Sequence, residues 1–341
     1  MADAAGESPL VLVHADPEAY LVAPAAERLI ASLAARPDLD LVLPGTNEPW
    51  CEAARVTPPF AYPTPTLLEE AAAAVAAAAA ALRPVEAPAS PVYAIRRAAL
   101  SRAAAKDSLE RLPERLRPLS AAVDPGAYLH RYGAMDASPR ADLAALVPEG
   151  ARAVLDVGCS RGATAAALRA RGVSFLAGIE PDAEDAAEAA AVYDAVRAEP
   201  LESVGAGFGR AFDAVLFGDV LEHLEDPSDA LVRVRAWLAP SGVVVASVPN
   251  VGHWSVIDDL LRGRFDYVPY SLLSGTHVRF FTRRTLVDLF EASGYRVRRI
   301  DVVRSPAPAG RTASRDRLRA LPGASDDLDV AEFLAVAEAA E

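Results

Sequence analysis

Two acidic residues end neighbouring hydrophobic segments of this sequence and flank a turn of small residues. Asp156 lies in VLDVGCSRGA (154–163), and Glu180 closes SFLAGIE (174–180). The turn that follows the first segment contains Gly158, Cys159, Ser160 and Gly162. Small residues let the backbone approach a ligand closely, and the start of the alanine-rich helix that follows offers free N–H groups. The pattern therefore predicts a ligand-binding turn with a carboxylate on each side.

The two carboxylates indicate which ligand suits this turn. A dinucleotide fingerprint, G-x-G-x-x-G, needs glycines where Ser160 and Ala163 stand, and Asp156 would repel a pyrophosphate. S-adenosylmethionine carries no phosphate: its amino-acid end has an ammonium group, and its ribose hydroxyls can donate to a carboxylate such as that of Glu180. The residues therefore favour an S-adenosylmethionine site, and a dinucleotide-dependent oxidoreductase is the disfavoured alternative.

Predicted strands and helices alternate around these residues. The expected strands are 151–158, 174–180, 211–220, 242–250 and 296–303, and the expected helices are 163–171, 182–193, 227–240 and 279–295, preceded by an entry helix at 128–148. Such alternation predicts an α/β fold with a mostly parallel, doubly wound sheet. Ligands of such sheets lie beyond the carboxyl ends of the strands, which is where Asp156 and Glu180 are expected.

The length of 341 residues suggests two domains. Residues 1–120 are expected to form a small α/β module, residues 126–303 the main domain, and residues 304–341 a tail that closes with a short acidic helix. The module is similar to part of a nucleotide-sugar glycosyltransferase, but only Asp16 stands where that family places a metal-binding acid pair. We therefore expect a degenerate module that serves in docking or substrate presentation.

Composition excludes several classes of partner and location. The net charge of −13 disfavours nucleic acid, which is bound by clustered positive charge. Two distant cysteines predict neither a disulfide framework nor a zinc site, and no apolar run is long enough for a membrane span. The first residues lack the pattern of a signal peptide, so a cytoplasmic protein is expected.

Residues 126–303 resemble the class I S-adenosylmethionine-dependent methyltransferases. The similarity runs through VLDVGCSRGA, GIEPD (178–182), FDAVLFGDVLEHLEDP (212–227), LAPSGVVVASVPN (238–250) and HVRFFTRRTLVDLFEASGY (277–295). The resemblance implies a Rossmann-like, seven-stranded sheet whose last strand is antiparallel, with S-adenosylmethionine as cofactor. It also implies that Asp156, Gly158 and Gly162 line the methionine end and that Glu180 holds the ribose. The other cofactor-binding residues expected from these motifs are Cys159, Ser160, Pro181, Asp219 and Val220.

The later motifs, together with HWSVIDDLLRGRFDY (253–267), are similar to a bacterial branch found beside or fused to glycosyltransferases of cell-surface polysaccharide synthesis. This resemblance implies O-methylation of a sugar, a cell-envelope glycan precursor or a related small metabolite, with a glycosyltransferase or a second copy of the chain as partner. The chain departs from the family pattern at Ser160, Pro200 and Ser274. The alternative is therefore a catalytically impaired partner or sensor that binds S-adenosylmethionine.

A hydroxyl acceptor can require a general base, most often histidine. His223 in DVLEHLEDP and His253 in VPNVGHWS follow expected strands on the functional edge, so both are candidate catalytic residues; each has a structural alternative in its loop. His277 is expected to anchor its loop rather than to act in catalysis. The histidines show no paired ligand spacing, so no metal site is predicted.

Overall fold

The computed structural model describes residues 8–16, 19–47, 52–79, 81–102, 113, 116, 118–131, 139–205, 207–268 and 271–340. It divides into two compact units, Met1–Ala134 and Met135–Glu341, each of which is described by itself.

The first unit is a small α/β module built on a six-stranded sheet. Its elements are β1 (Leu10–His14), β2 (Ala19–Leu21), α1 (Ala23–Ala34), β3 (Leu41–Thr46), η2 (Glu52–Ala54), α2 (Pro65–Ala78), β4 (Arg83–Val85), β5 (Val92–Arg96), α3 (Arg97–Leu100) and β6 (Ala121–Arg131). The strand order is β1-β5-β3-β6-β2, with β4 also paired to β6. Only β3 and β6 pair in parallel among these strands.

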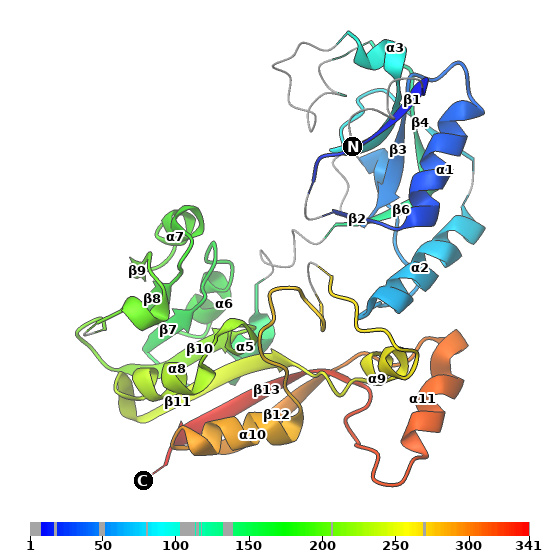
Figure 1. Cartoon of the computed structure of the whole chain (residues 1–341). Helices are drawn as coiled ribbons and strands as arrows, with labels where there is room; N and C mark the ends of the chain where they lie inside the picture. The colour runs from blue at the N-terminus through cyan, green and yellow to red at the C-terminus, as the bar shows by residue number, and fades with distance from the viewer. Residues whose placement is uncertain are drawn as a thin grey trace. The chain divides into compact units, whose positions relative to one another are not determined.

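The second unit alternates strands and helices along the chain (Figure 1). Its elements are α5 (Ala141–Leu146), β7 (Ala153–Val157), α6 (Ala165–Ala170), β8 (Phe175–Ile179), α7 (Ala183–Ala189), β9 (Ala195–Arg197), η4 (Leu201–Ser203), β10 (Phe212–Gly218), η5 (Leu221–His223), α8 (Pro227–Arg235), β11 (Leu238–Pro249), α9 (Trp254–Leu261), α10 (Arg283–Ala292), β12 (Tyr295–Arg304), η6 (Ala309–Arg311), α11 (Thr312–Arg319) and β13 (Val330–Ala339).

These strands form one seven-stranded sheet in the order β12-β13-β11-β10-β7-β8-β9. The strands from β11 to β9 pair in parallel, whereas β13 runs antiparallel to both of its neighbours. The order reverses between β7 and β10, the place where an open α/β sheet leaves a crevice for a ligand. The predicted α/β, Rossmann-like sheet of seven strands with an antiparallel last strand, accompanied by a small N-terminal α/β domain, is confirmed.

Alternate residues of each strand point to opposite faces of this sheet. A separate hydrophobic core therefore lies on each face. Leu155 and Phe217 pack with Leu231 of α8 and Phe290 of α10 on one face. On the other face, Val154, Leu216 and their neighbours pack against α5, α6 and the end of α7. The sheet is therefore covered on both faces, and its carboxyl edge is left for the site.

Two predicted helices prove wrong. The entry helix expected at 128–148 is replaced by β6, which is buried between β3 and β2, and by the short helix α5; residues 132–138 lie outside the described residues. The acidic helix expected at the end of the 304–341 tail is β13, although that tail does contain the short helix α11. In both strands, pairing on two sides outweighs the helix propensity of an alanine-rich sequence.

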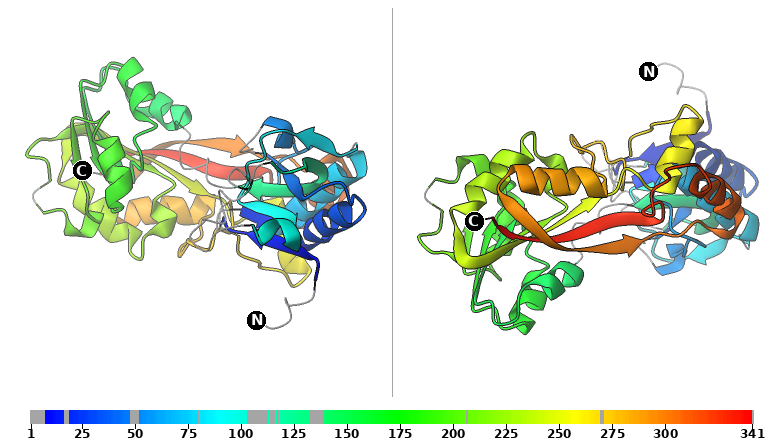
Figure 2. Two further views of the ribbon diagram at one scale, coloured as in Figure 1. Left: turned by 90° about the horizontal axis from the view of Figure 1, so that it is seen from above. Right: turned by 90° about the horizontal axis from the view of Figure 1, so that it is seen from below.

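The antiparallel strand therefore comes from the tail and not from residues 296–303. Figure 2 shows β13, in red, lying alongside β12, in orange. Seven registered residue pairs join β13 to β11, from Val243–Glu338 to Pro249–Glu332. The final segment of the chain thus belongs to the main sheet and brings Glu332 to its carboxyl edge. Among the described residues, no helix has the length and apolar character needed to cross a membrane.

Candidate functional site

Most of the predicted site residues lie along one edge of the second sheet. Asp156 is near the carboxyl end of β7, Glu180 follows β8, and Asp219 and Val220 follow β10. Because these three strands are neighbours and parallel, their carboxyl ends meet at the same place (Figure 1). The fold therefore brings together residues that are up to 64 positions apart in the sequence, from Asp156 to Val220.

The small-residue turn after β7 has a left-handed backbone at alternate positions. The φ angles of Gly158, Ser160 and Gly162 are 72°, 43° and 82°. A Cβ atom at Gly158 would lie 2.5 Å from Cγ2 of Val220, and one at Gly162 would lie 3.0 Å from Cε2 of Tyr193. Glycine is therefore required at both ends by conformation and by space, while Ser160 adopts the same kind of backbone at a cost in strain.

The Glu180 carboxylate is fixed by the backbone on both sides. It accepts one hydrogen bond from the N–H of Ser160 and another from the N–H of Asp182, each 2.9 Å long. Asp182 in turn caps α7, so exposed Pro181 lies between two anchored residues. A carboxylate has about four acceptor positions, so two remain for hydroxyl groups of a ligand. The turn and this acid are thus one hydrogen-bonded unit.

Asp156 is buried beneath the turn. Its Oδ2 accepts a 2.6 Å hydrogen bond from the hydroxyl of Tyr193. Burial raises the pKa of Asp156 to about 6, the nearby charge of Glu180 adds to this increase, and the Tyr193 bond opposes it. Burial likewise raises the pKa of the Cys159 thiol, so this side chain is a neutral packing group. Tyr193 was not predicted as a site residue, because no feature of the sequence near it indicates that it contacts Asp156.

Arg140, which was not predicted as a site residue, contacts three polar side chains on the adjacent part of this edge. Arg140 donates to Asp219, to Oγ of Ser247 (3.0 Å) and to Glu332 (2.6 Å). Ser247 also donates to Asp219 and accepts from its N–H, both at 2.9 Å. Asp219, which has a φ of 54°, is therefore held by side chains from β11 and from the start of α5. Burial raises the pKa of Glu332, and the Asp219 charge adds to the increase.

The two predicted catalytic histidines have different surroundings. His223 is exposed, and its Nδ1–H donates to the backbone carbonyl of Thr276 (3.2 Å). His253 is fully buried at the start of α9: Nε2–H donates to the carbonyl of Ser305 (2.9 Å), and Nδ1 accepts from Ser255. Burial lowers the pKa of His253 to about 4. Both nitrogens of His253 are occupied within the protein, so the geometry gives a catalytic role no support.

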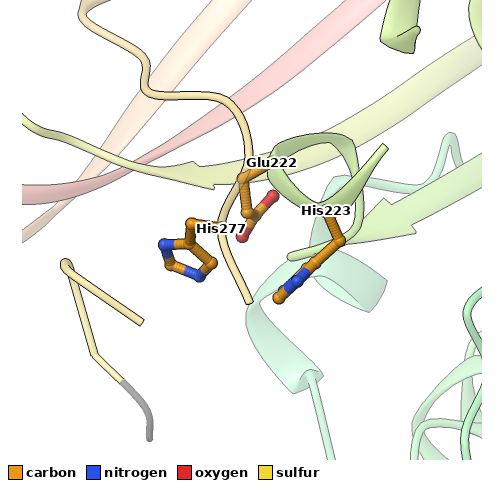
Figure 3. Close-up of side chains that lie close together, drawn as sticks. All are labelled: Glu222, His223 and His277. Atoms are coloured by element: carbon orange, nitrogen blue, oxygen red, sulfur yellow. The ribbon is translucent and has the colours of Figure 1, made fainter. Parts of the chain in front are cut away.

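His277 and Glu222 join His223 in a cluster that the sequence did not predict. One ligand atom from each of the three side chains lies within 4.8 Å of the others, as Figure 3 shows. Burial lowers the pKa of His277 to about 4, and the His223 charge adds to this. The prediction of no metal site was based on how the histidines are spaced in the sequence. In the folded chain, His277 lies beside Glu222 and His223, which are adjacent in the sequence. The adjacent Glu222 and His223 were the feature of the sequence that could have indicated a metal site.

A separate groove lies elsewhere on the second unit. It has a volume of about 960 Å³ and is lined by residues of α10, the end of α11 and the 321–328 loop. None of the predicted cofactor-binding residues lines it, so it is distinct from the edge described above.

Comparisons with known proteins show the family to which the chain belongs. Residues 101–300 match a family model described as a methyltransferase domain. A ubiquinone biosynthesis O-methyltransferase of Roseobacter denitrificans is 31% identical over 160 residues, which cover 45% of this chain and 63% of that protein. The Psychrobacter arcticus enzyme of the same name is 33% identical over 135 residues, covering 34% and 52%. The chain thus spans between about half and two thirds of the length of these curated relatives.

Among solved structures, a S-adenosylmethionine-dependent methyltransferase from Archaeoglobus fulgidus is similar. Its TM-score is 0.43 and its sequence identity 18%, and the match covers 60% of this chain and 93% of that one.

The raised pKa of Asp156 leads to a pH-dependent prediction. Because the folded-state pKa of about 6 exceeds the ordinary 3.8, the stabilising contribution of the protonated acid is present below about pH 4 and is lost as the pH rises to about 6. Asp156→Asn does not titrate and can still accept from Tyr193. At pH 7.5 its free energy of unfolding, measured by urea denaturation, should exceed that of the wild type by up to about 3 kcal/mol. The difference should shrink toward pH 4; a difference that does not vary with pH would contradict the assignment.

The left-handed backbone at Ser160 leads to a second prediction. Ser160→Gly removes the strain and loses only a weak 3.4 Å contact between Oγ and Asp185, so the free energy of unfolding should rise by about 1 kcal/mol. Ser160→Ala is the matched control, because it loses the hydroxyl and keeps the strained backbone. Thermal or urea unfolding of the three proteins makes the comparison. A glycine variant no more stable than the alanine variant would show that the turn is not strained.

Proposed function

We propose that this chain, which belongs to the methyltransferase domain family, binds S-adenosylmethionine at the 158–162 turn and transfers its methyl group to an oxygen atom of a small molecule. The observation that carries the proposal is the Glu180 carboxylate, which is fixed by two backbone N–H groups, one of them from the glycine-rich turn.

The residues present fit this cofactor. Glu180 has acceptor positions left for two ribose hydroxyls. Gly158 and Gly162 let the turn keep its left-handed backbone and pack closely against Val220 and Tyr193. The edge is rich in carboxylates, with Asp156, Glu180 and Asp219 at the ends of three adjacent strands. This negative charge favours a ligand with an ammonium and a sulfonium group and disfavours a pyrophosphate.

We assign each predicted residue a role on this basis. Glu180 holds the ribose, and Ser160 positions Glu180 through its N–H. Asp156 supports the turn from below, through Tyr193, and supplies negative charge near the amino-acid end. Gly158 and Val220 pack against each other and close the site on the β10 side.

When bound, S-adenosylmethionine supplies an electrophilic methyl group on a positively charged sulfur. Transfer is an in-line displacement, so the protein contributes by aligning the acceptor oxygen and excluding water. His223, which is exposed beyond the end of β10, lies on the side proposed for the acceptor. For buried His253 we propose a structural role, as the cap of α9 and an anchor for the backbone at Ser305.

A hydroxyl acceptor is supported by the curated relatives, whose names describe O-methyltransferases of ubiquinone biosynthesis. The sugar, glycan precursor or other small metabolite expected from the sequence remains part of the proposal, as does a glycosyltransferase or a second copy of this chain as partner. For the first unit we keep the proposal of a docking module. The alternative is a sensor that binds S-adenosylmethionine without turnover, and it rests on the departures at Ser160, Pro200 and Ser274.

Calorimetric titration tests the cofactor assignment. Wild-type protein should bind S-adenosylmethionine and S-adenosylhomocysteine and not NAD. Glu180→Gln should bind S-adenosylmethionine at least about tenfold more weakly, or about 1.4 kcal/mol, because it replaces a charged acceptor. Glu291→Gln, on the exposed face of α10, is the control and should leave affinity unchanged. Equal affinity of both variants, or tight binding of NAD, would reject the site.

Turnover separates the enzyme from the sensor. Release of S-adenosylhomocysteine in the presence of sugar nucleotides and polyhydroxylated phenols should exceed release without an acceptor. A protein that binds the cofactor normally and transfers its methyl group to neither class would favour the sensor.

A further inference from the structure

Glu222, His223 and His277 form a compact set of ligand atoms beyond the end of β10. Glu222 and His223 belong to η5, and His277 lies on a later loop. Two backbone hydrogen bonds fix this loop to η5, because the N–H groups of Val278 and Arg279 both donate to the carbonyl of Glu222, at 2.9 and 3.0 Å. The separation of no more than 4.8 Å among the three ligand atoms is therefore set by paired backbone segments.

Both histidines present the nitrogen that a metal ion needs. Nδ1 of His223 contacts the carbonyl of Thr276, and Nδ1 of His277 contacts that of Leu272, at 3.2 and 3.3 Å. A carbonyl can only accept, so Nδ1 carries the hydrogen and Nε2 of the neutral ring keeps its lone pair. No hydrogen bond to either Nε2 is found among the described residues. Metal-binding histidines usually have this arrangement, in which a backbone carbonyl fixes the tautomer.

The Glu222 carboxyl group supplies an independent observation. It is fully buried, and neither of its oxygens has a hydrogen-bond partner in the part of the chain that the structure describes. A buried carboxyl group without a partner is unfavourable, so it is rare unless something compensates it. Figure 3 shows this group between the imidazole rings of His223 and His277.

We propose that Glu222, His223 and His277 bind a divalent transition-metal cation, such as Zn²⁺ or Mn²⁺, and that the cation holds the acceptor hydroxyl. Two imidazoles and one carboxylate suit these ions better than Mg²⁺ or Ca²⁺, which prefer oxygen ligands. Three protein ligands leave coordination positions open for an acceptor oxygen. The role in acceptor binding rests on the proposed methyl transfer; the metal site itself does not.

The cation would make a hydroxyl acceptor reactive. Binding lowers the pKa of the hydroxyl, which gives its proton to solvent. The resulting oxygen anion forms the new O–CH₃ bond, the S–CH₃ bond breaks, and its electron pair stays on sulfur as a neutral thioether. In this account His223 is a metal ligand instead of the general base expected from the sequence.

Metal binding by the full chain tests the proposal. Protein stripped with EDTA is dialysed against ZnCl₂ or MnCl₂, and bound metal is measured by elemental analysis. The wild type and the control His14→Ala, which lies in the first unit, should each bind one equivalent. Glu222→Gln and His277→Ala should bind at least about tenfold more weakly, and near-native circular dichroism shows whether each variant is folded.

The same preparations are titrated with S-adenosylmethionine, so that the two proposals can fail separately. Weak metal binding with unchanged cofactor affinity in both variants supports the site. Wild-type protein that binds S-adenosylmethionine but neither metal, or variants that bind metal as the wild type does, would overturn it. Wild-type protein that binds the metal but not S-adenosylmethionine would support the metal site and reject the function proposed above.

Discussion

The hydrogen bond from the N–H of Ser160 to the Glu180 carboxylate is the interaction on which the site depends. It joins the turn after β7 to the acid after β8, so a 2.9 Å hydrogen bond holds together the two features predicted to bind one ligand. The turn that donates this bond has a left-handed backbone at Ser160 and also at Gly158 and Gly162 on either side. The strained turn and the fixed carboxylate therefore belong to one hydrogen-bonded unit, and backbone strain of this kind is common at binding sites.

Negative charge is the second constraint on this edge. Asp156, Glu222 and Glu332 are carboxyl groups whose pKa burial raises, and Arg140 provides the main local countercharge through Asp219 and Glu332. Such a concentration of acids is unfavourable without cations. A sulfonium cofactor on one side and a divalent metal on the other would each offset part of it, so the charge pattern connects the proposed function with the proposed metal site.

The sequence predicted the part of this site that depends on local pattern. Asp156 and Glu180 were recognisable because each ends a hydrophobic run that forms a buried strand, and the doubly wound sheet followed from the alternation of elements. The partners that come from distant segments were not visible. Arg140 and Glu332 are 192 positions apart, and Glu332 reaches the edge only because β13, whose alanine and glutamate content suggests a helix, pairs between β11 and β12. His277 likewise meets Glu222 through the backbone pairing of its loop.

A crystal structure with S-adenosylhomocysteine bound tests the central claim most directly. We expect both ribose hydroxyls at hydrogen-bond distance, about 2.5–3.0 Å, from the Glu180 oxygens, with the 158–162 turn in the conformation described above. Electron density for the ligand away from this turn, or a Glu180 side chain turned away from a ligand bound there, would contradict the account.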